Sequence, residues 1–188
     1  MLARTLALTF HGIGAPIVSQ APGEGRYFVT EDIFRDTIRS LAGLEAKSGV
    51  KIRITFDDGN LSDHAVGLPT LLQNGRTARF FVLAGRIEKI GYLSGTQLRE
   101  MVAAGMSIGT HGWDHVDWSV LDEAGQRKGT IDARCKIEDE AGCAVREATI
   151  PFGRFDKALL AHLKQCDYDR IYTSSGELSC DGAWFCPR

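Results

Sequence analysis

Two adjacent aspartates and a pair of histidines are the residues of this sequence whose types and spacing could do chemistry. Asp57 and Asp58 end a segment in which apolar and polar residues alternate, and Gly59 follows them directly. Two carboxylates side by side repel each other unless a positive charge lies between them. His111 and His115 come later in the chain at a spacing that suits metal ligands. Together these residues predict a chemical site built around a metal ion.

The elements that must position these residues can be read from the pattern of apolar segments. Strand-like segments occur at residues 6–10, 50–56, 78–83, 106–110, 143–150 and 171–173. Helix-like segments lie between them, the first beginning after Thr30 as its N-cap and the others at residues 68–72, 97–104, 123–140 and 157–166. This alternation predicts an α/β fold with a mostly parallel sheet and helices outside it.

The polar residues of interest all follow predicted strands. In a parallel α/β sheet, binding and catalytic groups gather at the carboxyl ends of the strands, because the loops there converge on one crevice. His11 follows the first strand, Asp57 and Asp58 follow the second, and His111 follows the strand at 106–110. Residues 151–153, which read Pro-Phe-Gly, follow the strand at 143–150. Four strand ends therefore predict one shared site.

The composition disfavours several classes of partner. The chain has 188 residues, of which 44% are hydrophobic, and a formal net charge of −2. This length supports one core and no linker-like stretch divides it, so we expect residues 1–188 to form a single catalytic domain. Lysines and arginines are scattered, which disfavours nucleic acid and anionic membranes as partners. The apolar run at residues 6–10 is too short for a signal peptide or a membrane span, so we expect a cytoplasmic protein.

Three motifs carry a resemblance to a known family. Residues 55–59 read TFDDG, residues 110–115 read THGWDH, and residues 151–153 read PFG. In order and spacing they resemble the motifs of the polysaccharide deacetylase family, the NodB-homology domains of carbohydrate esterase family 4, from about Leu6 to about Thr173. The resemblance implies a distorted (β/α) barrel, smaller than the roughly 250 residues of a full TIM barrel. It also implies metal-dependent removal of acetyl groups from N-acetylated sugars.

The resemblance assigns roles to individual residues. Asp58, His111 and His115 correspond to the family's metal ligands, and three protein ligands leave positions open for water and substrate. This ligand set suits one zinc ion, although cobalt, nickel or iron would also fit. Asp57 corresponds to the catalytic base that takes a proton from the attacking water. The alternative for Asp57, which we favour less, is a cap at the end of its strand.

The PFG turn and a neighbouring tryptophan are candidates for contacts with the substrate. By resemblance, the backbone N–H of Phe152, between Pro151 and Gly153, donates to the oxyanion that forms during hydrolysis. The alternative is that residues 151–153 form a simple turn without a role in the reaction. Trp113 could stack on a sugar ring, but aromatic packing in the core explains a tryptophan equally well.

Two positions depart from the family pattern. Where the family carries an arginine that bonds the base, this chain has Thr149, and Arg154 is a possible substitute. The usual final motif, with a histidine as general acid, is missing, and His11 offers a replacement if the first and last strands of the barrel are neighbours. This arrangement resembles the circularly permuted branch of the family, which includes deacetylases of poly-N-acetylglucosamine.

We therefore expect a metal-dependent hydrolase that removes N-acetyl groups from an amino sugar or an N-acetylated glycan and releases acetate. One alternative is hydrolysis of another amide, such as a cyclic ureide. Another is a carbohydrate-binding module without catalytic activity. A binding module has no need for both a base and metal ligands, so the presence of Asp57 together with Asp58, His111 and His115 favours the enzyme.

Overall fold

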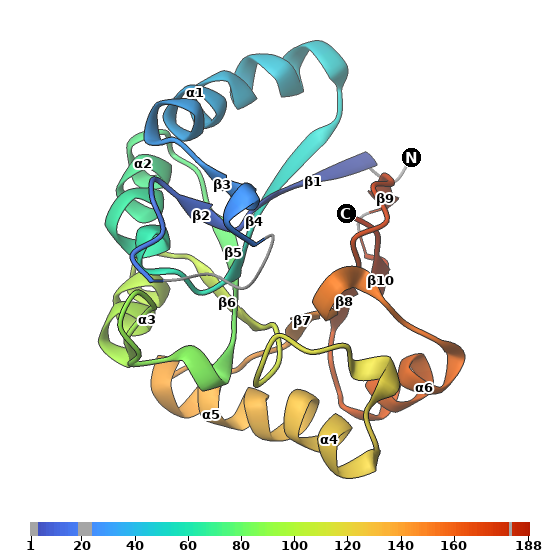
Figure 1. Ribbon diagram of the computed structural model, residues 1–188. Coiled ribbons are helices and arrows are strands. Elements are labelled where there is room, and N and C mark those ends of the chain that lie inside the picture. The colour runs from blue at the N-terminus through green and yellow to red at the C-terminus, as the bar shows by residue number, and fades with distance from the viewer. Residues whose placement is uncertain (1–3, 19–23, 181) are drawn as a thin grey trace.

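The computed structural model describes residues 4–18, 24–180 and 182–188. Its main element is one curled sheet with the strand order β10–β8–β7–β6–β5–β4–β1–β9 (Figure 1). The strands are β1 (Arg4–Phe10), β4 (Lys51–Asp58), β5 (Ala78–Val82), β6 (Ser107–Thr110), β7 (Glu147–Thr149), β8 (Arg170–Tyr172), β9 (Ser179–Cys180) and β10 (Phe185–Cys186). Every neighbouring pair from β10 to β1 is parallel, and β9 is antiparallel to β1. The predicted α/β fold, a distorted (β/α) barrel of mostly parallel strands, is confirmed, and its sheet forms a curled half-barrel.

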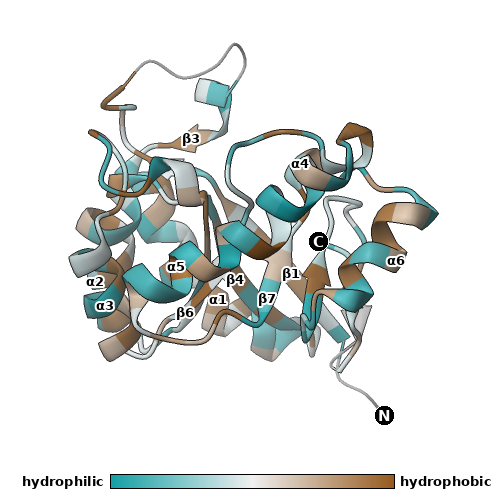
Figure 2. Cartoon of the chain, turned by 90° about the horizontal axis from the view of Figure 1, so that it is seen from below, coloured by the Kyte–Doolittle hydropathy of each residue, from teal (hydrophilic) through white to brown (hydrophobic). Residues whose placement is uncertain are grey.

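Helices surround this sheet on the outside (Figure 1). They are α1 (Glu31–Ser48), α2 (Leu68–Gln73), α3 (Gly95–Ala103), α4 (Glu123–Arg127), α5 (Ala133–Ala141) and α6 (Lys157–Gln165). Figure 2 shows hydrophilic and hydrophobic residues on the same helices, as expected where one face packs on a sheet and the other meets water. Within the described residues, no helix is both long enough and apolar enough to cross a membrane.

The main core holds β4 in place, and β4 carries both aspartates. Ile54 and Phe56 of this strand are buried, and the ring of Phe56 stacks on Phe80 of β5 with 4.6 Å between the ring centroids. Phe34 of α1 meets Phe56 edge-on from the helix side. Burial of each such side chain contributes about 1.5–3 kcal/mol relative to leaving it exposed. This packing fixes the end of β4, where Asp57 and Asp58 follow.

Helix α1 begins where the sequence predicts it. Thr30 is its N-cap, and the Thr30 side chain accepts a hydrogen bond from the backbone N–H of Ile33. Phe34, Ile38 and Leu41 are buried on one face. The helix ends at Gly49, whose left-handed conformation is the usual C-terminal signal of a helix.

The predicted helix at residues 123–140 is also present, although it contains two glycines. Helices α4 and α5 are joined by a wide π-helical turn at Lys128–Asp132, so the helical region continues to Ala141. A Cβ at Gly129 would lie 3.0 Å from Nε1 of the buried Trp118. The glycine therefore allows this helical region to approach closely a second hydrophobic cluster, which contains Trp118 together with buried residues of β7, β8 and α6.

The end of the chain differs from the sequence prediction. The strand predicted at 143–150 is only Glu147–Thr149, and β9 and β10 were not predicted. The prediction that the first and last strands are neighbours is wrong in detail: β10 pairs with β8 at one edge, whereas β9 pairs with β1 at the other. Each of these two strands has two residues, too few to show an alternating pattern. The last part of the chain thus contributes one strand to each edge of the sheet. The end of the chain lies close to β1, where Arg188 contacts Thr9 (Figure 1).

Candidate active site and metal centre

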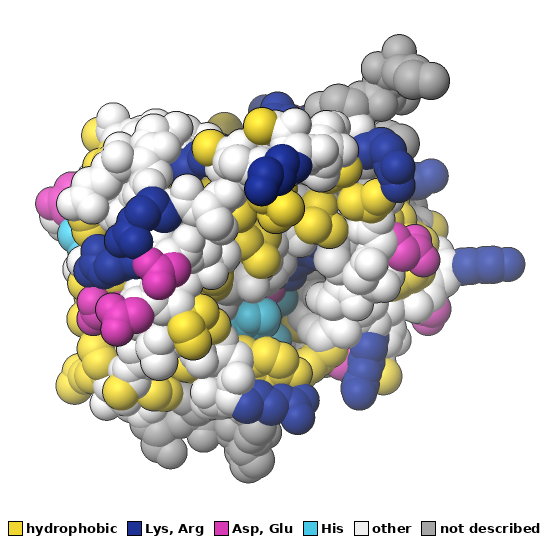
Figure 3. Space-filling model, turned by 90° about the horizontal axis from the view of Figure 1, so that it is seen from above, with side chains coloured by type: hydrophobic (Ala, Val, Ile, Leu, Met, Phe, Trp, Pro, Cys, Tyr) yellow, Lys and Arg dark blue, Asp and Glu magenta, His cyan; other side chains and the backbone are white. Residues whose placement is uncertain are grey.

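A cavity of about 450 Å³ opens where the carboxyl ends of the parallel strands converge. Figure 3 shows it as a hollow with histidine side chains at its base and hydrophobic side chains around it. Its lining includes the predicted residues His11, Asp57, Asp58, His111, His115 and Phe152. It also includes Glu24, Arg26, Tyr27, Phe28 and Ser174, which the sequence did not predict. All four predicted strand ends therefore meet at one site.

The end of β4 has an unusual backbone that brings both aspartates to the cavity. Asp57 and Asp58 still pair with β5, opposite Phe81 and Val82. Successive strand residues normally point to opposite faces. Asp58, however, has φ of 75°, a left-handed conformation that costs a residue with a side chain of order 1–3 kcal/mol. Such strain concentrates at functional sites, and here it allows both carboxylates to line one cavity.

Asp58, His111 and His115 form a cluster that could hold a metal ion. One ligand atom from each lies within 4.8 Å of the others. Asp58 Oδ1 is buried and has no hydrogen-bond partner among the described residues, which is costly unless something else binds it. One carboxylate oxygen and two imidazole nitrogens are donors that suit zinc, cobalt, nickel or iron. The residues present therefore fit a divalent transition metal.

His111 is held with one ring nitrogen free for a ligand. Its Nδ1 lies 3.0 Å from the backbone carbonyl oxygen of Thr149, which can only accept a hydrogen bond. The hydroxyl of Thr149, 2.8 Å from the same nitrogen, can accept as well, so these contacts favour the tautomer with the proton on Nδ1 and the lone pair on Nε2. Burial lowers the pKa of His111, against the opposing effect of Asp57 and Asp58. A lowered pKa favours the neutral ring that a metal ligand needs.

His115 is held in a comparable way by a carboxylate. Its Nδ1 lies 3.0 Å from Oε1 of Glu24, and the ring of Phe152 packs against it with 4.3 Å between centroids. Glu24 belongs to the 3-10 turn Glu24–Tyr27, which leads into β3 (Phe28–Val29). No motif or periodicity in the sequence marks this segment.

Asp57 is paired with a residue that the sequence analysis missed. Its carboxylate accepts two hydrogen bonds from Arg188, one from Nη1 to Oδ1 at 2.9 Å and one from Nη2 to Oδ2. Both side chains are 3% exposed. The other candidate, Arg154, is 70% exposed and contacts Asp117 instead. Arg188, and not Arg154, is therefore the arginine that pairs with Asp57.

Arg188 is itself held by hydroxyl groups of three strands. Its Nη2 donates to Oγ1 of Thr149 at 2.9 Å, and its Nη1 lies 3.2 Å from Oγ1 of Thr55 and 3.3 Å from Oγ1 of Thr9. Thr149, the residue at the position of the family's arginine, thus contacts both Arg188 and His111. A small hydroxyl side chain here leaves room for an arginine that arrives from the end of the chain.

The charges around Asp57 determine its protonation. Burial alone would raise the pKa of Asp57, but Arg188, His111 and His11 lower it further than burial raises it. Its pKa therefore lies well below its usual range, and the carboxylate is ionised at neutral pH. An ionised, buried carboxylate beside a cluster of metal-ligand type can accept a proton from water.

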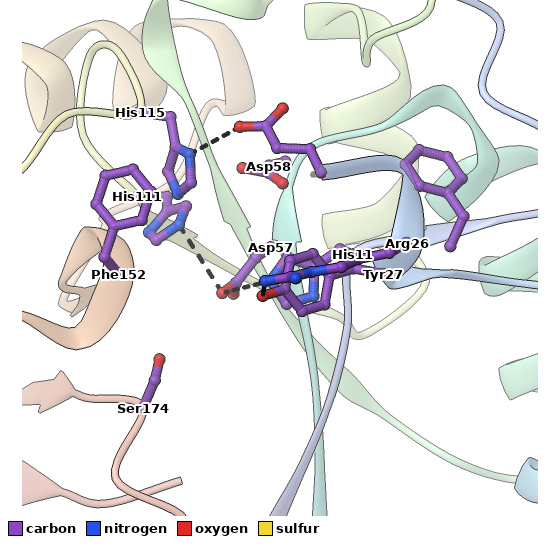
Figure 4. Close-up of a pocket in the computed structure, with 11 residues that line it drawn as sticks. His11, Arg26, Tyr27, Asp57, Asp58, His111, His115, Phe152 and Ser174 are labelled. Carbon is purple, nitrogen blue, oxygen red and sulfur yellow. Dashed lines mark hydrogen bonds and ion pairs between the residues drawn. The ribbon is translucent and has the colours of Figure 1, made fainter. Parts of the chain in front are cut away.

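His11 lies on the opposite side of Asp57 from His111 (Figure 4). Its Nε2 is 4.0 Å from Oδ2 of Asp57, and its side chain is 30% exposed. The ring stacks on Tyr27, with 5.0 Å between the centroids. His11 thus lies beside Asp57 and also lines the open cavity, a placement that suits a proton donor.

The PFG turn lies at the rim of the cavity. Phe152 has φ of 59° and is 52% exposed, whereas Pro151 is buried. Gly153 also has positive φ, and a Cβ on it would lie 2.7 Å from the backbone nitrogen of Ser174. Trp113 is placed differently: it is not among the described residues that line the cavity, and Lys128 lies over its ring at 5.3 Å.

The half-barrel with a site at the carboxyl ends of its strands defines the architecture as a (β/α) barrel of parallel strands, and comparison with known families identifies the family. The polysaccharide deacetylase family model matches residues 45–171. The chain therefore belongs to the polysaccharide deacetylase family. The matched range contains Asp57, Asp58, His111, His115 and Phe152. His11, Glu24 and Arg188, which complete the site, lie outside it.

Individual relatives agree with this assignment. A Bacillus subtilis protein called YxkH, assigned by name to the polysaccharide deacetylases, is 26% identical over 131 residues, which are 69% of this chain and 47% of that protein. The peptidoglycan-N-acetylglucosamine deacetylase PgdA of Listeria monocytogenes is 28% identical over 60% of this chain and 24% of its own length. The chain thus spans about half of the first relative and about a quarter of the second.

A solved structure shows the same fold over nearly the whole chain. IcaB from Ammonifex degensii superposes with a TM-score of 0.80 at 22% identity, covering 99% of this chain and 91% of that one. This match extends beyond the family model at both ends. It therefore includes most of the segments that carry His11, Glu24 and Arg188.

Proposed function

We propose that this protein is a metal-dependent hydrolase that removes N-acetyl groups from an amino sugar or an N-acetylated glycan and releases acetate. The observation that carries the proposal is the arrangement around Asp57. An ionised carboxylate lies between a histidine of the candidate metal cluster and a second, partly exposed histidine (Figure 4). Base, ligands and proton donor are the parts that hydrolysis of an amide requires.

Asp58, His111 and His115 would hold the metal. When bound, a divalent transition metal would act as a Lewis acid that polarises the acetyl carbonyl and lowers the pKa of the attacking water. Asp57 takes the proton of the attacking water, and Arg188 keeps its carboxylate ionised and oriented. The carboxylate needs no rearrangement to act, because both of its oxygens are already held by Arg188.

Two further groups serve the later stages of the reaction. The backbone N–H of Phe152 donates to the oxyanion, and the strained left-handed conformation at this residue keeps the turn at the cavity rim. His11 gives a proton to the nitrogen of the departing amine, since it lies beside Asp57 and reaches the solvent-exposed part of the cavity. Tyr27, stacked on His11, fixes the plane of that imidazole.

The size and lining of the cavity support a sugar substrate. Its volume of about 450 Å³ lies within the range of small-molecule sites. Tyr27 and Phe152 line the cavity and are 46% and 52% exposed, so each adds aromatic surface for a sugar beside the histidine on which its ring packs. PgdA acts, by its name, on N-acetylglucosamine in peptidoglycan. An N-acetylglucosamine unit is therefore the substrate we propose.

A screen for acetate release tests this function. The purified chain is loaded with zinc or cobalt and incubated with N-acetylglucosamine, its oligomers, peptidoglycan fragments and a panel of cyclic ureides. We expect acetate from at least one N-acetylated sugar and a free amine in equal amount. Binding of these sugars without acetate release would support a silent binding module and contradict the proposal. Hydrolysis of a ureide alone would contradict it as well.

A further inference from the structure

We propose that Glu24 is a positioning residue for the metal centre, acting through the ligand His115. This inference rests on the proposed metal-binding function. Glu24 lies outside the part of the chain that matches the family model, which begins at residue 45. It reaches the site from the 3-10 turn Glu24–Tyr27, between the two short strands β2 (Gly12–Ile13) and β3.

The first step is the contact between Glu24 and His115. Oε1 of Glu24 lies 3.0 Å from Nδ1 of His115, and the two side chains are 19% and 13% exposed. A carboxylate can only accept a hydrogen bond, so the contact places the ring proton on Nδ1. The lone pair then sits on Nε2, the nitrogen that remains for a metal. A carboxylate in this position also makes the imidazole a stronger ligand.

The second step is the agreement between the two histidines. His111 has its Nδ1 against the backbone carbonyl oxygen of Thr149, as described above. Each histidine therefore has Nδ1 bound by an oxygen of the protein and Nε2 left for the cluster. His111 Nδ1 contacts both the backbone carbonyl and the side-chain hydroxyl of Thr149, whereas His115 Nδ1 contacts the carboxylate of Glu24. A substitution of Glu24 therefore removes the carboxylate acceptor of His115, whereas a substitution of Thr149 leaves the carbonyl acceptor of His111 in place.

The third step is the charge that stabilises Glu24. Arg86, after β5, lies between Glu24 and Asp58: its Nη2 is 3.7 Å from Oε2 of Glu24, and its Nη1 is 3.6 Å from Oδ1 of Asp58. The guanidinium also lies over the ring of Tyr92 at 4.9 Å. The positive charge of Arg86 offsets the repulsion between the carboxylates of Glu24 and Asp58. It lies at ion-pair distance from both but forms no hydrogen bond with Asp58 Oδ1. That oxygen thus stays available for a ligand.

The alternative is that the Glu24–His115 contact only ties the turn to the barrel. The two roles differ in what they affect. A tether contributes to folding alone, whereas a positioning residue sets the tautomer of His115 and the affinity for metal. Removal of an acceptor behind a ligating histidine typically weakens metal binding by 10–100-fold.

The test compares zinc affinities of Glu24→Ala, Glu24→Gln and the parent, measured by competition with a chromophoric chelator. Glu100→Gln is the matched control, because Glu100 also contacts a histidine, His64, at 2.7 Å but lies outside the site. We expect Glu24→Ala to bind zinc about 10–100-fold more weakly than the parent. Glu24→Gln keeps an acceptor oxygen and should fall between the two. Glu100→Gln should bind as the parent does.

Nitrogen-15 NMR of the His115 ring without metal gives a second readout. In the parent we expect the proton on Nδ1, and in Glu24→Ala a mixture of both tautomers. Unchanged zinc affinity and an unchanged tautomer in a folded Glu24→Ala or Glu24→Gln variant would overturn the inference. A parent chain that binds no zinc would instead overturn the proposed metal site itself, so the two failures can be distinguished.

Discussion

Replacement of Arg188 with methionine removes the positive charge that faces Asp57 and keeps most of the volume of the side chain. Arg188 and Asp57 are both 3% exposed and share two hydrogen bonds, so the substitution leaves a buried carboxylate without its counter-charge. Loss of one partner from a buried ion pair typically costs about 3–5 kcal/mol of unfolding free energy. We expect a loss of this size for Arg188→Met at neutral pH.

The same charge also controls the pKa of Asp57. With charge centres roughly 4 Å apart and an effective dielectric constant of about 20, the attraction is about 4 kcal/mol, or about three pKa units. Burial raises the pKa of Asp57, and Arg188 is the largest of the opposing causes. Without Arg188, the pKa of Asp57 should therefore rise from well below its ordinary value to above it. The acidic limb of the pH–rate profile should move to higher pH.

The dependence of stability on pH has a definite sign. The folded-state pKa of Asp57 lies below its ordinary value of 3.8, so the contribution of the pair is fully present above that pH. It is lost as the pH falls through the folded-state value, because the carboxylate takes up a proton. The difference in stability between the parent and Arg188→Met should thus be largest near neutral pH, and it should shrink as the pH falls through the raised pKa of Asp57 in the variant, which lies above the ordinary value.

Urea denaturation at several pH values, together with the pH–rate profile, measures both effects. Arg154→Met is the control for loss of an exposed arginine near the site, since Arg154 is 70% exposed, pairs with Asp117 and lies over the ring of Phe152 at 5.6 Å, without contact to Asp57 among the described residues. We expect it to change stability by less than about 0.5 kcal/mol. Arg188→Lys keeps the charge without the two-pronged hydrogen bond and should lie between Arg188→Met and the parent. Equal stability and equal pH profiles for Arg188→Met and Arg154→Met would refute this account of Asp57.

Two further substitutions separate the roles of the remaining site residues. Asp57→Asn should keep its metal but lose about 10²–10⁴-fold in turnover, because the amide cannot accept the proton of water; loss of metal in elemental analysis would show that Asp57 and not Asp58 is the ligand. His11→Ala should keep fold and metal content while turnover falls by about 10²-fold or more and the alkaline limb of the pH–rate profile weakens. Near-normal turnover in that variant would remove His11 from the mechanism.

The parts of the site that sequence predicted are those with a local signal. Asp57 and Asp58 end an alternating strand, and His111 and His115 are four residues apart after another. The rule that functional groups follow the carboxyl ends of parallel strands then places these residues, with His11, at one edge of the sheet. The structure brings all five to one cavity. Local pattern and fold topology were sufficient here.

Arg188 and Glu24 could not be predicted because their positions depend on long-range pairing. Arg188 follows β10, which has only two residues and takes its place from the pairing of Phe185 with Ile171 and of Cys186 with Tyr172. Glu24 lies in a short turn without periodicity, positioned by the two-stranded sheet of β2 and β3. In both cases the side chain that completes the site lies more than 90 residues from its partner. The sequence held one weak signal for Arg188. Thr149 stands where the family has an arginine, so some other positive residue was needed to pair with Asp57.

The most direct test of the central proposal is a titration of the metal-free chain with zinc while acetate release from an N-acetylglucosamine oligomer is measured. We expect no turnover without metal, and a rise that ends at about one zinc per chain, because three ligands form one open site. The variant with Asp58, His111 and His115 all replaced by alanine should show neither binding nor turnover. Acetate release at the full rate from the metal-free chain, or zinc binding by the triple variant as tight as that of the parent, would contradict the proposal.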